Sequence, residues 1–381
     1  MRRSGATSAW ARSLQLSSSR LLRLTIVVAA LGCSARPSPA VHSRGQPKLN
    51  SPPANISPSA TRALDDDARS DAPPPDPALA SLGQGVVTPE QRGALLRVMA
   101  ELLRERYVFP ETAASVGQKL LEAERRGDYA ALSTVTQLTA RLTDDLQRLA
   151  GDKHLGLQVV PSGDSSPAGA GPPPNADNQG YAESRLLEGN VGYVDLRFFA
   201  PAEVAQEAAG RAMAAIATAN ALVFDLRNNM GGAPSGVQYL CSYLFADKVH
   251  LNSLYWREGE RTDEFWTLDE VRGAKRPDVP VFVLTSARTF SGAEEFAYNL
   301  QTRKRATIVG EVTRGGANPG NSYALAPGLM MRIPTGRAIN PVTKTNWEGV
   351  GVQPDVPVDE EQALERALDL ARAVANSHRR K

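Results

Sequence analysis

Hydrophobic and polar positions divide the chain into a long polar leader, a helical stretch and a region of alternating strands and helices. Between residues 89 and 150, apolar side chains recur at the i, i+3, i+4 and i+7 spacing of amphipathic helices. The first of these helices carries an apolar stripe made of Leu95, Leu96, Met99, Leu102 and Leu103. Thr88 is placed to cap this helix, and Pro89 to open its first turn. The pattern predicts a small helical bundle over residues 89–150.

From residue 190 onward, short apolar runs alternate with helical stretches. The predicted strands cover residues 190–199, 221–224, 279–285 and 306–311, followed by a β-rich stretch to residue 358. The predicted helices cover residues 201–219, the segments after Gly232 and Gly292, and residues 359–377. Strands that alternate with helices are typical of an α/β fold. We therefore expect an α/β core over residues 151–381.

The first 33 residues are predicted to be an export signal. Basic side chains precede an apolar run at residues 24–31 that is too short to cross a bilayer. Gly32 and Cys33 then resemble a bacterial lipobox, in which the cysteine is lipidated and becomes the mature N-terminus. Ordinary cleavage after Ala35 is the main alternative, and a mitochondrial-type presequence is another.

Residues 34–88 are rich in Pro, Ser, Ala and Asp and have too few apolar side chains to build a core. We expect a disordered linker, which would hold a lipidated chain away from a membrane surface. The predicted location is the periplasm or the outer membrane of a bacterium, with attachment through a lipidated Cys33. Under ordinary cleavage the same residues would be a disordered leader.

Charge and cysteine content narrow the classes of partner. The chain has 43 Lys and Arg against 41 Asp and Glu, a net charge of +2, which predicts no nucleic-acid partner. Cys241 is the only cysteine besides Cys33, so the mature domain has no pair for a disulfide, and we expect a buried Cys241. No Cys/His spacing or carboxylate cluster is typical of a metal site. We expect neither a metal nor another cofactor.

Ser291 lies where an apolar run ends and a helical stretch begins. A turn of this kind exposes a serine hydroxyl beside the free N–H groups of a helix start, including that of Gly292, which are then available to an oxyanion. A helix N-cap is the alternative, because serine is favoured there to satisfy the same N–H groups. The residues around Ser291 alone do not separate a nucleophile from a cap.

A second polar turn follows the predicted strand at residues 221–224 and contains Gly231 and Gly232. Paired glycines let the backbone approach a ligand and turn its N–H groups inward, although they also occur in ordinary turns. Two strand-turn-helix passages with polar turns are typical of neighbouring loops at one edge of an α/β sheet. We expect Gly231, Gly232 and Gly292 to form an oxyanion hole beside Ser291.

Four segments taken in order resemble the tail-specific, or C-terminal processing, serine peptidases. They are DLRNNMGG (225–232), VFVLTSARTFSGAEEFA (281–297), ATIVGEVTRGG (306–316) and EGVGVQPDVPV (348–358). The resemblance runs from about Pro89 to the C-terminus and favours the branch similar to the domains of interphotoreceptor retinoid-binding protein. It implies a crotonase-like α/β spiral preceded by a helical bundle, with Ser291 as the nucleophile and the N–H groups of Gly232 and Gly292 as oxyanion donors.

One position departs from the bacterial members, which use a lysine base in a GE-T-GKG motif. Gly316 stands where that lysine would be, and Arg314 cannot replace it because a guanidinium stays protonated. Members that lack the lysine carry a histidine in a D-x-H-L element similar to residues 152–155. The resemblance therefore implies that His154 is the general base. Without it, a lone histidine between a helix and a strand is more often structural.

A third group is expected to orient the base. Glu348 matches a glutamate of the charge-relay network in the tricorn-like members of the family, although a carboxylate in a plain turn is an equal interpretation. Asp152 is a second candidate, because it lies two residues before His154. Gly151 predicts an intervening turn, which counts against Asp152.

These residues together predict a serine-type peptidase that hydrolyses peptide bonds of exported proteins or peptides through an acyl-enzyme on Ser291. Its partner would be a polypeptide substrate. The polar segment at residues 161–184 is too short for the peptide-binding PDZ domain that many family members insert there. Two alternatives use the same scaffold, namely a binding protein for a hydrophobic ligand and a hydrolase of another acyl group.

Overall fold

The structure is a computed structural model that describes residues 76–82, 86–160 and 178–378. The predicted export signal, Cys33 and the linker up to residue 75 lie outside the described residues, as does the segment 161–177. Within the described ranges, every helix is too short or too polar to cross a membrane.

The end of the predicted linker is folded, which corrects the expectation of disorder up to residue 88. A short 3-10 helix, η2 (Pro77–Leu79), is followed by a turn, and Leu79, Leu82 and Val87 are buried against the helices that follow. The three apolar side chains bury enough surface to order this segment, although its overall composition is polar.

Three helices follow, and they fall within the range predicted for the bundle. They are α1 (Pro89–Arg106), α2 (Pro110–Arg126) and α3 (Val135–Ala150). The predicted cap is confirmed, because the Thr88 hydroxyl accepts a hydrogen bond from Gln91 N–H and the Gln91 side chain accepts one from Thr88 N–H. Gly127 and Gly151 end α2 and α3 in the left-handed conformation that glycine adopts without strain. The predicted leucine and methionine stripe of α1 is fully buried.

The helices share their core with an antiparallel sheet of three strands. Its strands, in spatial order, are β1 (Gly156–Val159), β10 (Leu329–Pro334) and β9 (Gly320–Ala326). Every second residue of β10, namely Leu329, Met331 and Ile333, is buried among the helical side chains. The predicted division at residue 150 therefore does not separate the helices from the strands that complete their core.

A six-stranded sheet forms the centre of the rest of the chain. Its order is β12 (Val356–Pro357), β8 (Ala306–Gly310), β7 (Val281–Thr285), β4 (Ala221–Asp225), β3 (Val191–Leu196) and β2 (Tyr181–Leu187). All neighbouring pairs are parallel except β2 with β3. The prediction of an α/β core preceded by a helical region is confirmed.

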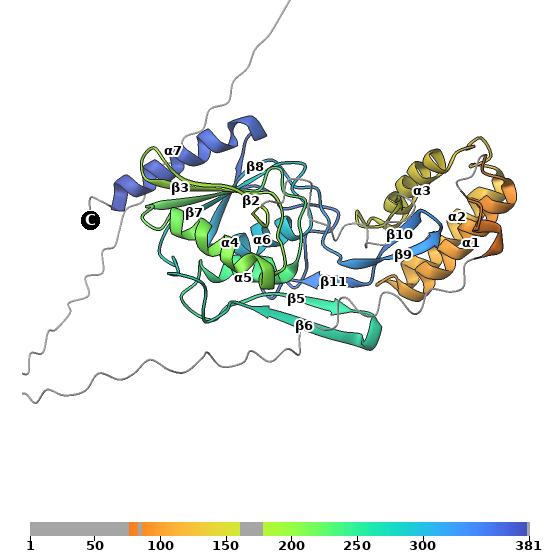
Figure 1. Cartoon of the computed structure of the whole chain (residues 1–381), viewed down its shortest axis with the longest axis horizontal. Helices are drawn as coiled ribbons and strands as arrows, with labels where there is room; N and C mark the ends of the chain where they lie inside the picture. Colours follow the sequence, from red (N-terminus) through yellow and green to blue (C-terminus); the bar gives the residue numbers. More distant parts are fainter. Residues whose placement is uncertain (1–75, 83–85, 161–177, 379–381) are drawn as a thin grey trace, which may run out of the picture. The chain divides into compact units, whose positions relative to one another are not determined.

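Helices cover both faces of this sheet (Figure 1). The helices α4 (Ala202–Ala215), α5 (Pro234–Ser242) and α6 (Gly292–Thr302) pack on one face, and α7 (Glu360–His378) packs on the other. Strand β4 shows the alternation that this arrangement needs, because Leu222 and Phe224 face the first group while Ala221 and Val223 face α7. Cys241, on α5, is fully buried as predicted.

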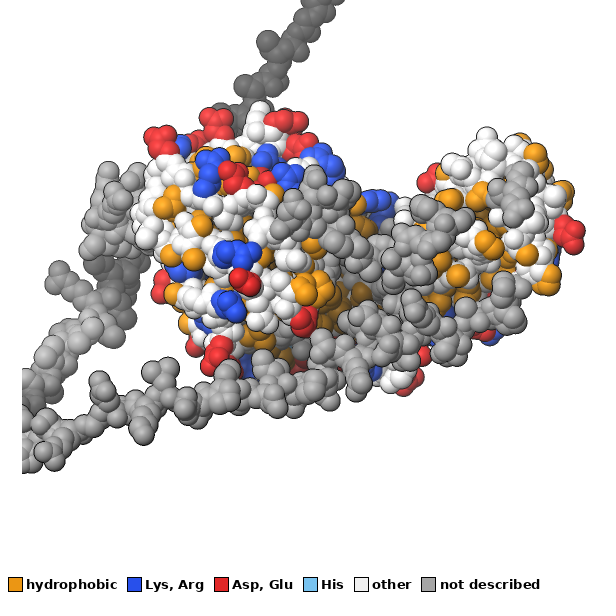
Figure 2. Space-filling view, in the orientation of Figure 1, with side chains coloured by type: hydrophobic (Ala, Val, Ile, Leu, Met, Phe, Trp, Pro, Cys, Tyr) orange, Lys and Arg blue, Asp and Glu red, His pale blue; other side chains and the backbone are white. Residues whose placement is uncertain are grey.

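A third sheet consists of β11 (Gly336–Ile339), β5 (His250–Trp256) and β6 (Arg261–Trp266), with the 3-10 turn η3 (Glu258–Glu260) between the last two. His250 opens β5, where its ring stacks on Trp266. Figure 2 shows basic and acidic side chains interspersed on the visible face around the six-stranded sheet, as a net charge near zero allows.

The register of the central sheet brings the two polar turns together. Strands β4 and β7 are parallel, with Asp225 opposite Leu284, so the turns that follow them leave the same edge of the sheet. The expectation of neighbouring loops is confirmed. This edge carries Ser291 and the Gly231–Gly232 pair.

The shared core of helices and strands makes a testable prediction. Replacing Met331 by Ala removes a fully buried side chain on the helical face of β10 and should lower the free energy of unfolding by about 2–5 kcal/mol. Met330→Ala, on the opposite face of the same strand and partly exposed, is the matched control and should change it by less than about 1 kcal/mol. Urea unfolding followed by circular dichroism measures both, and equal effects would contradict the shared core.

Candidate active site

Ser291 lies in a strained turn between β7 and α6. Its φ is 54° and its ψ is −121°, and non-glycine residues are uncommon at positive φ, where such strain costs about 1–3 kcal/mol. A helix N-cap residue has extended backbone angles. The backbone of Ser291 therefore differs from that of an ordinary cap, and strained strand-to-helix turns of this kind are typical of serine nucleophiles.

The buried carboxylate of Glu294 holds this turn. One of its oxygen atoms accepts hydrogen bonds from Ser291 N–H at 2.8 Å and Gly316 N–H at 2.9 Å. The other accepts from Gly315 N–H at 2.6 Å and from the Thr313 hydroxyl. Glu294 thus links the serine turn to the loop after β8. Sequence reasoning missed this residue, although Ser291-x-x-Glu294 has the spacing of a capping box.

The glycine pair lies against the serine. A Cβ added to Gly231 would be 2.7 Å from the Ser291 Cβ, and one added to Gly232 would be 2.1 Å from the Phe199 carbonyl oxygen. Their φ angles are 106° and 138°, so both positions require glycine for conformation and for space. A Cβ added to Gly292 would be 3.1 Å from the Gly232 nitrogen, so these two backbones are in contact.

Gly231 does not fit the predicted role of an oxyanion donor. Its N–H donates to the Asn229 side-chain oxygen at 2.8 Å, and its carbonyl accepts from Phe199 N–H. Within the described residues, the N–H groups of Gly232 and Gly292 have no such partner. The correction has a physical cause, because the fully buried Asn229 also donates to the Leu196 carbonyl and is thereby oriented toward Gly231.

His154 lies beside the serine turn. Its ring stacks on Phe290, the residue before Ser291, with centroids 4.5 Å apart and planes inclined by 29°. A Cβ added to Gly316 would lie 2.2 Å from Phe290 Cε2 and 2.9 Å from His154 Cε1. The imidazole and the phenyl ring therefore occupy the space that a side chain at position 316 would need.

The surroundings of His154 favour its neutral form. The residue is 6% exposed, and its Nδ1 is buried without a hydrogen-bond partner. Burial, reinforced by the positive charges of Arg332 and Arg314, lowers the pKa of His154 to about 3. The imidazole is therefore unprotonated at neutral pH, and a neutral imidazole can accept a proton.

Glu348 lies close to His154 without a hydrogen bond to it in the described structure. Its carboxylate accepts from the N–H groups of Lys153, Ala317 and Asn318. Burial and the neighbouring Asp152 raise its pKa well above the usual range of a glutamate. These three bonds fix the carboxylate between the segment that carries His154 and the loop that follows Gly316.

Asp152 is also close, and the predicted turn after Gly151 is present. One carboxylate oxygen of Asp152 accepts from His154 N–H at 2.9 Å, and the other accepts from Tyr107 Oη at 3.1 Å and Asn318 Nδ2 at 2.9 Å. Asp152 thus holds the backbone of His154. Burial raises its pKa in spite of these bonds.

Asp152, His154 and Glu348 each offer one potential ligand atom, and the three atoms lie within 4.8 Å of one another. This is the one set of residues in the described ranges that could hold a metal ion. Each carboxylate already accepts three hydrogen bonds, and two guanidinium groups act on His154. A bound cation would compete with all of them.

Comparison of the sequence with protein families gives two matches. The sequence profile of peptidase family S41 matches residues 190–358. The profile described as the N-terminal domain of peptidase S41 in eukaryotic IRBP matches residues 86–187. The two ranges follow one another along the chain and include Ser291, His154 and Glu348.

Individual relatives have low sequence identity to this chain. The carboxyl-terminal-processing peptidase 2, chloroplastic, of Arabidopsis thaliana is 29% identical over 174 residues, which are 44% of this chain and 32% of the relative. The chain thus matches about a third of that relative's length.

Among solved structures, one from Parabacteroides merdae ATCC 43184, provisionally described as a peptidase, has a TM-score of 0.50 at 20% identity. The match covers 75% of this chain and 97% of that structure's chain. A lipoprotein from Streptococcus agalactiae has a TM-score of 0.49 at 14% identity, covering 74% and 96%. At 20% identity, the likeness to the structure from Parabacteroides merdae shows the fold alone.

The bonding of Glu294 can be tested by Glu294→Gln. Both carboxylate oxygens accept from backbone N–H groups, so either orientation of the amide turns its NH2 toward one or two buried donors. We expect the free energy of unfolding to fall by about 1–4 kcal/mol. Urea unfolding at pH 7 measures the change.

Glu295→Gln is the matched control, because Glu295 is also buried on the same helix. Burial raises the pKa of Glu295 to about 7, and its polar neighbours are the amides of Asn252 and Asn299, which can face a glutamine. This variant should change the free energy of unfolding by less than about 1 kcal/mol. Similar losses in both variants would show that Glu294 has no special part in the turn.

Proposed function

Because the chain belongs to peptidase family S41, we propose that it is a serine-type peptidase that hydrolyses peptide bonds through an acyl-enzyme on Ser291. The observation that carries the proposal is the backbone of Ser291, which is strained at φ 54° beside the free N–H groups of Gly232 and Gly292. A protein that only bound a hydrophobic ligand would have no use for a strained serine. The strain is explained if the turn aims a hydroxyl at a substrate.

In the first step, Ser291 Oγ attacks the carbonyl carbon of the scissile bond while His154 removes the hydroxyl proton. The C–O bond forms, and the carbonyl electron pair moves to the oxygen. The N–H groups of Gly232 and Gly292 then donate to this oxyanion. The low pKa of His154 leaves its imidazole neutral and free to accept a proton at pH 7, and it also makes the imidazole a weaker base.

In the second step, the tetrahedral intermediate collapses, the C–N bond breaks, and His154 returns the proton to the leaving amine. Water then attacks the acyl-enzyme with His154 again as the base. The ester bond to Ser291 breaks, the new carboxylate leaves, and the serine regains its proton. The cycle needs no group beyond the residues of this chain and one water molecule.

Glu348 would orient the imidazole and stabilise its charged form. A Glu348 oxygen and a His154 ring nitrogen lie within 4.8 Å, and a small movement or a bridging water would complete a hydrogen bond between them. Asp152 would act through the backbone of His154, to which it is bonded.

The substrates would be proteins or peptides outside the cytoplasm. The basic, apolar and Gly32-Cys33 segments at the start of the chain support export, and they favour attachment through a lipidated Cys33 over cleavage after Ala35. The long polar segment that follows would then give the enzyme reach from the membrane surface.

Labelling with a fluorophosphonate probe tests the nucleophile. The probe forms a covalent bond with an activated serine, so the wild type should be labelled and Ser291→Ala should not. His154→Ala should label at least about a hundredfold more slowly, because a positioned base contributes that much or more. In-gel fluorescence against time gives the rates.

Ser286→Ala is a matched control on the same turn, because Ser286 is buried and its hydroxyl donates to the Arg227 carbonyl. This variant should still label if it folds. Absence of serine-dependent labelling in the wild type at every pH from 6 to 9 would contradict the peptidase proposal.

The pH dependence tests the base. The depressed pKa of His154 leaves it neutral from about pH 5 upward, and the raised pKa of Glu348 means that this carboxylate ionises between its ordinary range and neutrality. The labelling rate should therefore rise with pH toward neutrality, level off, and not rise further above pH 9 as a lysine base would require. Glu348→Gln should lower the plateau of the labelling rate and make the rate depend less on pH below neutrality.

The stability of the fold sets the lowest pH at which the labelling rate can be measured. Below about pH 6.5 the unfolded chain binds a proton on its histidines, whereas folded His154 does not, so His154 makes the fold less stable as the pH falls. Circular dichroism at each pH shows whether a lower labelling rate is caused by unfolding or by protonation of the base. A rate that keeps rising between pH 9 and 10.5 in the folded protein would exclude His154 as the base.

A further inference from the structure

Arg288 lies on the exposed side of the serine turn (residues 286–292), three residues before Ser291. Through Nε and Nη2 it donates to the side-chain oxygen of Asn228, at 3.1 and 2.9 Å. Through Nη1 and Nη2 it donates to the two carboxylate oxygens of Glu360, at 2.9 and 2.6 Å. All three nitrogen atoms of this guanidinium therefore bond to partners that are 60 and 72 residues away in the sequence.

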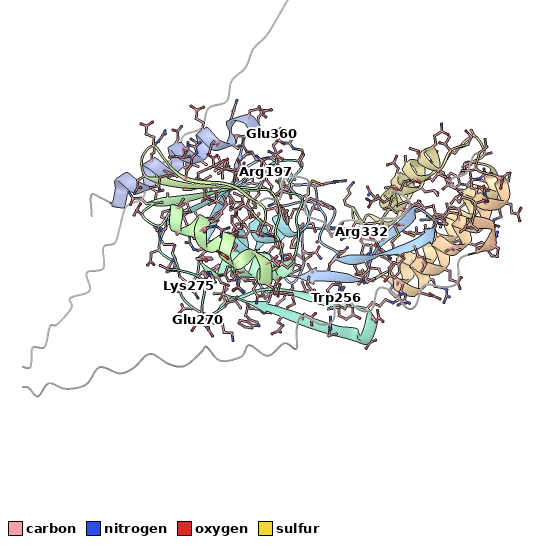
Figure 3. All side chains as sticks on the ribbon, viewed as in Figure 1. Arg197, Trp256, Glu270, Lys275, Arg332 and Glu360 are labelled. Carbon is pink, nitrogen blue, oxygen red and sulfur yellow. The ribbon has the colours of Figure 1, made fainter. Side chains whose placement is uncertain are left out.

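The two partners belong to segments that surround the candidate active site. Asn228 lies in the glycine turn (residues 226–233), four residues before Gly232, and Glu360 is the first residue of α7 (Figure 3). The glycine turn carries the Gly232 N–H and the serine turn carries the Gly292 N–H, which are the two proposed oxyanion donors. One guanidinium thus joins these two turns to each other and to the helix on the other face of the central sheet.

Glu360 is itself held in place by backbone contacts. Its N–H donates to a Glu311 carboxylate oxygen at 3.2 Å, and its carbonyl accepts from Arg227 Nη1 at 2.7 Å. Exposed ion pairs usually add little to stability, but two parallel hydrogen bonds to a fixed carboxylate restrict the orientation of a guanidinium. Glu360 therefore holds Arg288 in the orientation in which it reaches Asn228.

The buried side of the two turns is joined without Arg288. Two buried hydroxyls of the serine turn donate to backbone carbonyls of the glycine turn, Ser286 Oγ at 2.6 Å and Thr289 Oγ1 at 2.8 Å. On the exposed side, Arg288 is the only partner that the Asn228 side chain has among the described residues. Removal of Arg288 should therefore leave the turns folded and loosen only their exposed side.

On the basis of the proposed peptidase function, we propose that Arg288 is a positioning residue for the oxyanion hole. It would act through Asn228, by fixing the distance between the Gly232 and Gly292 N–H groups, and not by contact with the substrate. Two donors on different turns stabilise an oxyanion only at a defined separation, and a displacement of about 1 Å can slow a reaction about a hundredfold. The first turn of α7 would thereby contribute to the site from the other face of the sheet.

Fluorophosphonate labelling of the full chain tests this role. Arg288→Gln and Asn228→Ala each remove the bond between the turns, and each should lower the maximal labelling rate about tenfold. The probe concentration that gives half of this rate should stay within about twofold, because the loss falls on the transition state. Asn228→Ala leaves the charge unchanged, so it separates positioning from the loss of a positive charge.

The double variant shows whether the two residues act through one bond. It should label within about twofold of either single variant, because both substitutions break the same contact. Independent effects would multiply to about a hundredfold. Partial unfolding would instead lower the final fraction of labelled protein, which the same gels measure.

Arg211→Gln is the matched control. Arg211 lies on α4 and also binds a glutamate and an asparagine, with Nη1 3.0 Å from Glu207 and Nη2 donating to the Asn178 side-chain oxygen at 2.7 Å. Its side chain is 59% exposed and that of Arg288 is 53% exposed. This variant should label at the wild-type rate, within about twofold.

Hydrogen–deuterium exchange followed by mass spectrometry tests the contact without catalysis. Arg288→Gln should speed the exchange of peptides from the glycine turn, which carries no substitution in this variant, by at least about threefold. Peptides from α4 should keep their wild-type exchange rates. Arg211→Gln should leave the exchange of the glycine turn unchanged.

Four results would overturn the role of Arg288: wild-type labelling rates in both single variants, independent effects in the double variant, equal slowing in Arg211→Gln, or unchanged exchange of the glycine turn. If Arg288→Gln does not fold, Asn228→Ala and its labelling rate decide the question. A labelled wild type with unaffected variants contradicts only the role of Arg288. An unlabelled wild type contradicts the peptidase proposal, and the positioning role with it.

Discussion

The carboxylate of Glu294 connects the two segments on which the candidate active site depends. It accepts hydrogen bonds from Ser291 N–H on one side and from Thr313, Gly315 and Gly316 on the other. A negative charge in the first turn of α6 is favoured by the helix dipole, and the four donors offset part of the cost of burial, which still raises the pKa of Glu294. Because the backbone of Ser291 is strained, these bonds prevent the turn from relaxing to the extended conformation of an ordinary cap.

The position of the His154 ring depends on the loop after β8, which carries Gly316. Gly316, which Glu294 holds by its N–H, leaves room for the stacked rings of His154 and Phe290. Any side chain at position 316 would begin 2.2 Å from Phe290, which is less than a van der Waals contact. A side chain at position 316 therefore does not fit while the Phe290 and His154 rings lie where they do.

Hydrophobic periodicity was enough to predict β3, β4, β7 and β8 of the central sheet and the helices that cover it, because these elements bury regular sets of positions, as β4 does on its two faces. It missed the edge strand β2, most of whose side chains are exposed or half-buried. The same periodicity in β10 shows that one face is buried but not which element covers it, and only the fold pairs β10 with the helices. The role of Gly231 was beyond the sequence for a similar reason. Which N–H of a glycine pair stays free depends on the side chain of Asn229, which reaches Gly231 only in the folded turn. The distance between His154 and Glu348 likewise depends on backbone donors from two loops that lie far apart in the sequence.

The charges around His154 favour the neutral imidazole over the charged imidazolium. Burial and two guanidinium groups keep the imidazole neutral, which a base needs before it acts. In the proposed mechanism, the same surroundings oppose the charge that forms on the imidazole when it takes the serine proton. Asp152 and Glu348 are held by other donors and make no hydrogen bond to the ring in the described structure. In the proposed mechanism, stabilisation of the imidazolium therefore depends on a small movement of Glu348 or on a bridging water, and the three backbone N–H groups that hold this carboxylate limit how far it can move.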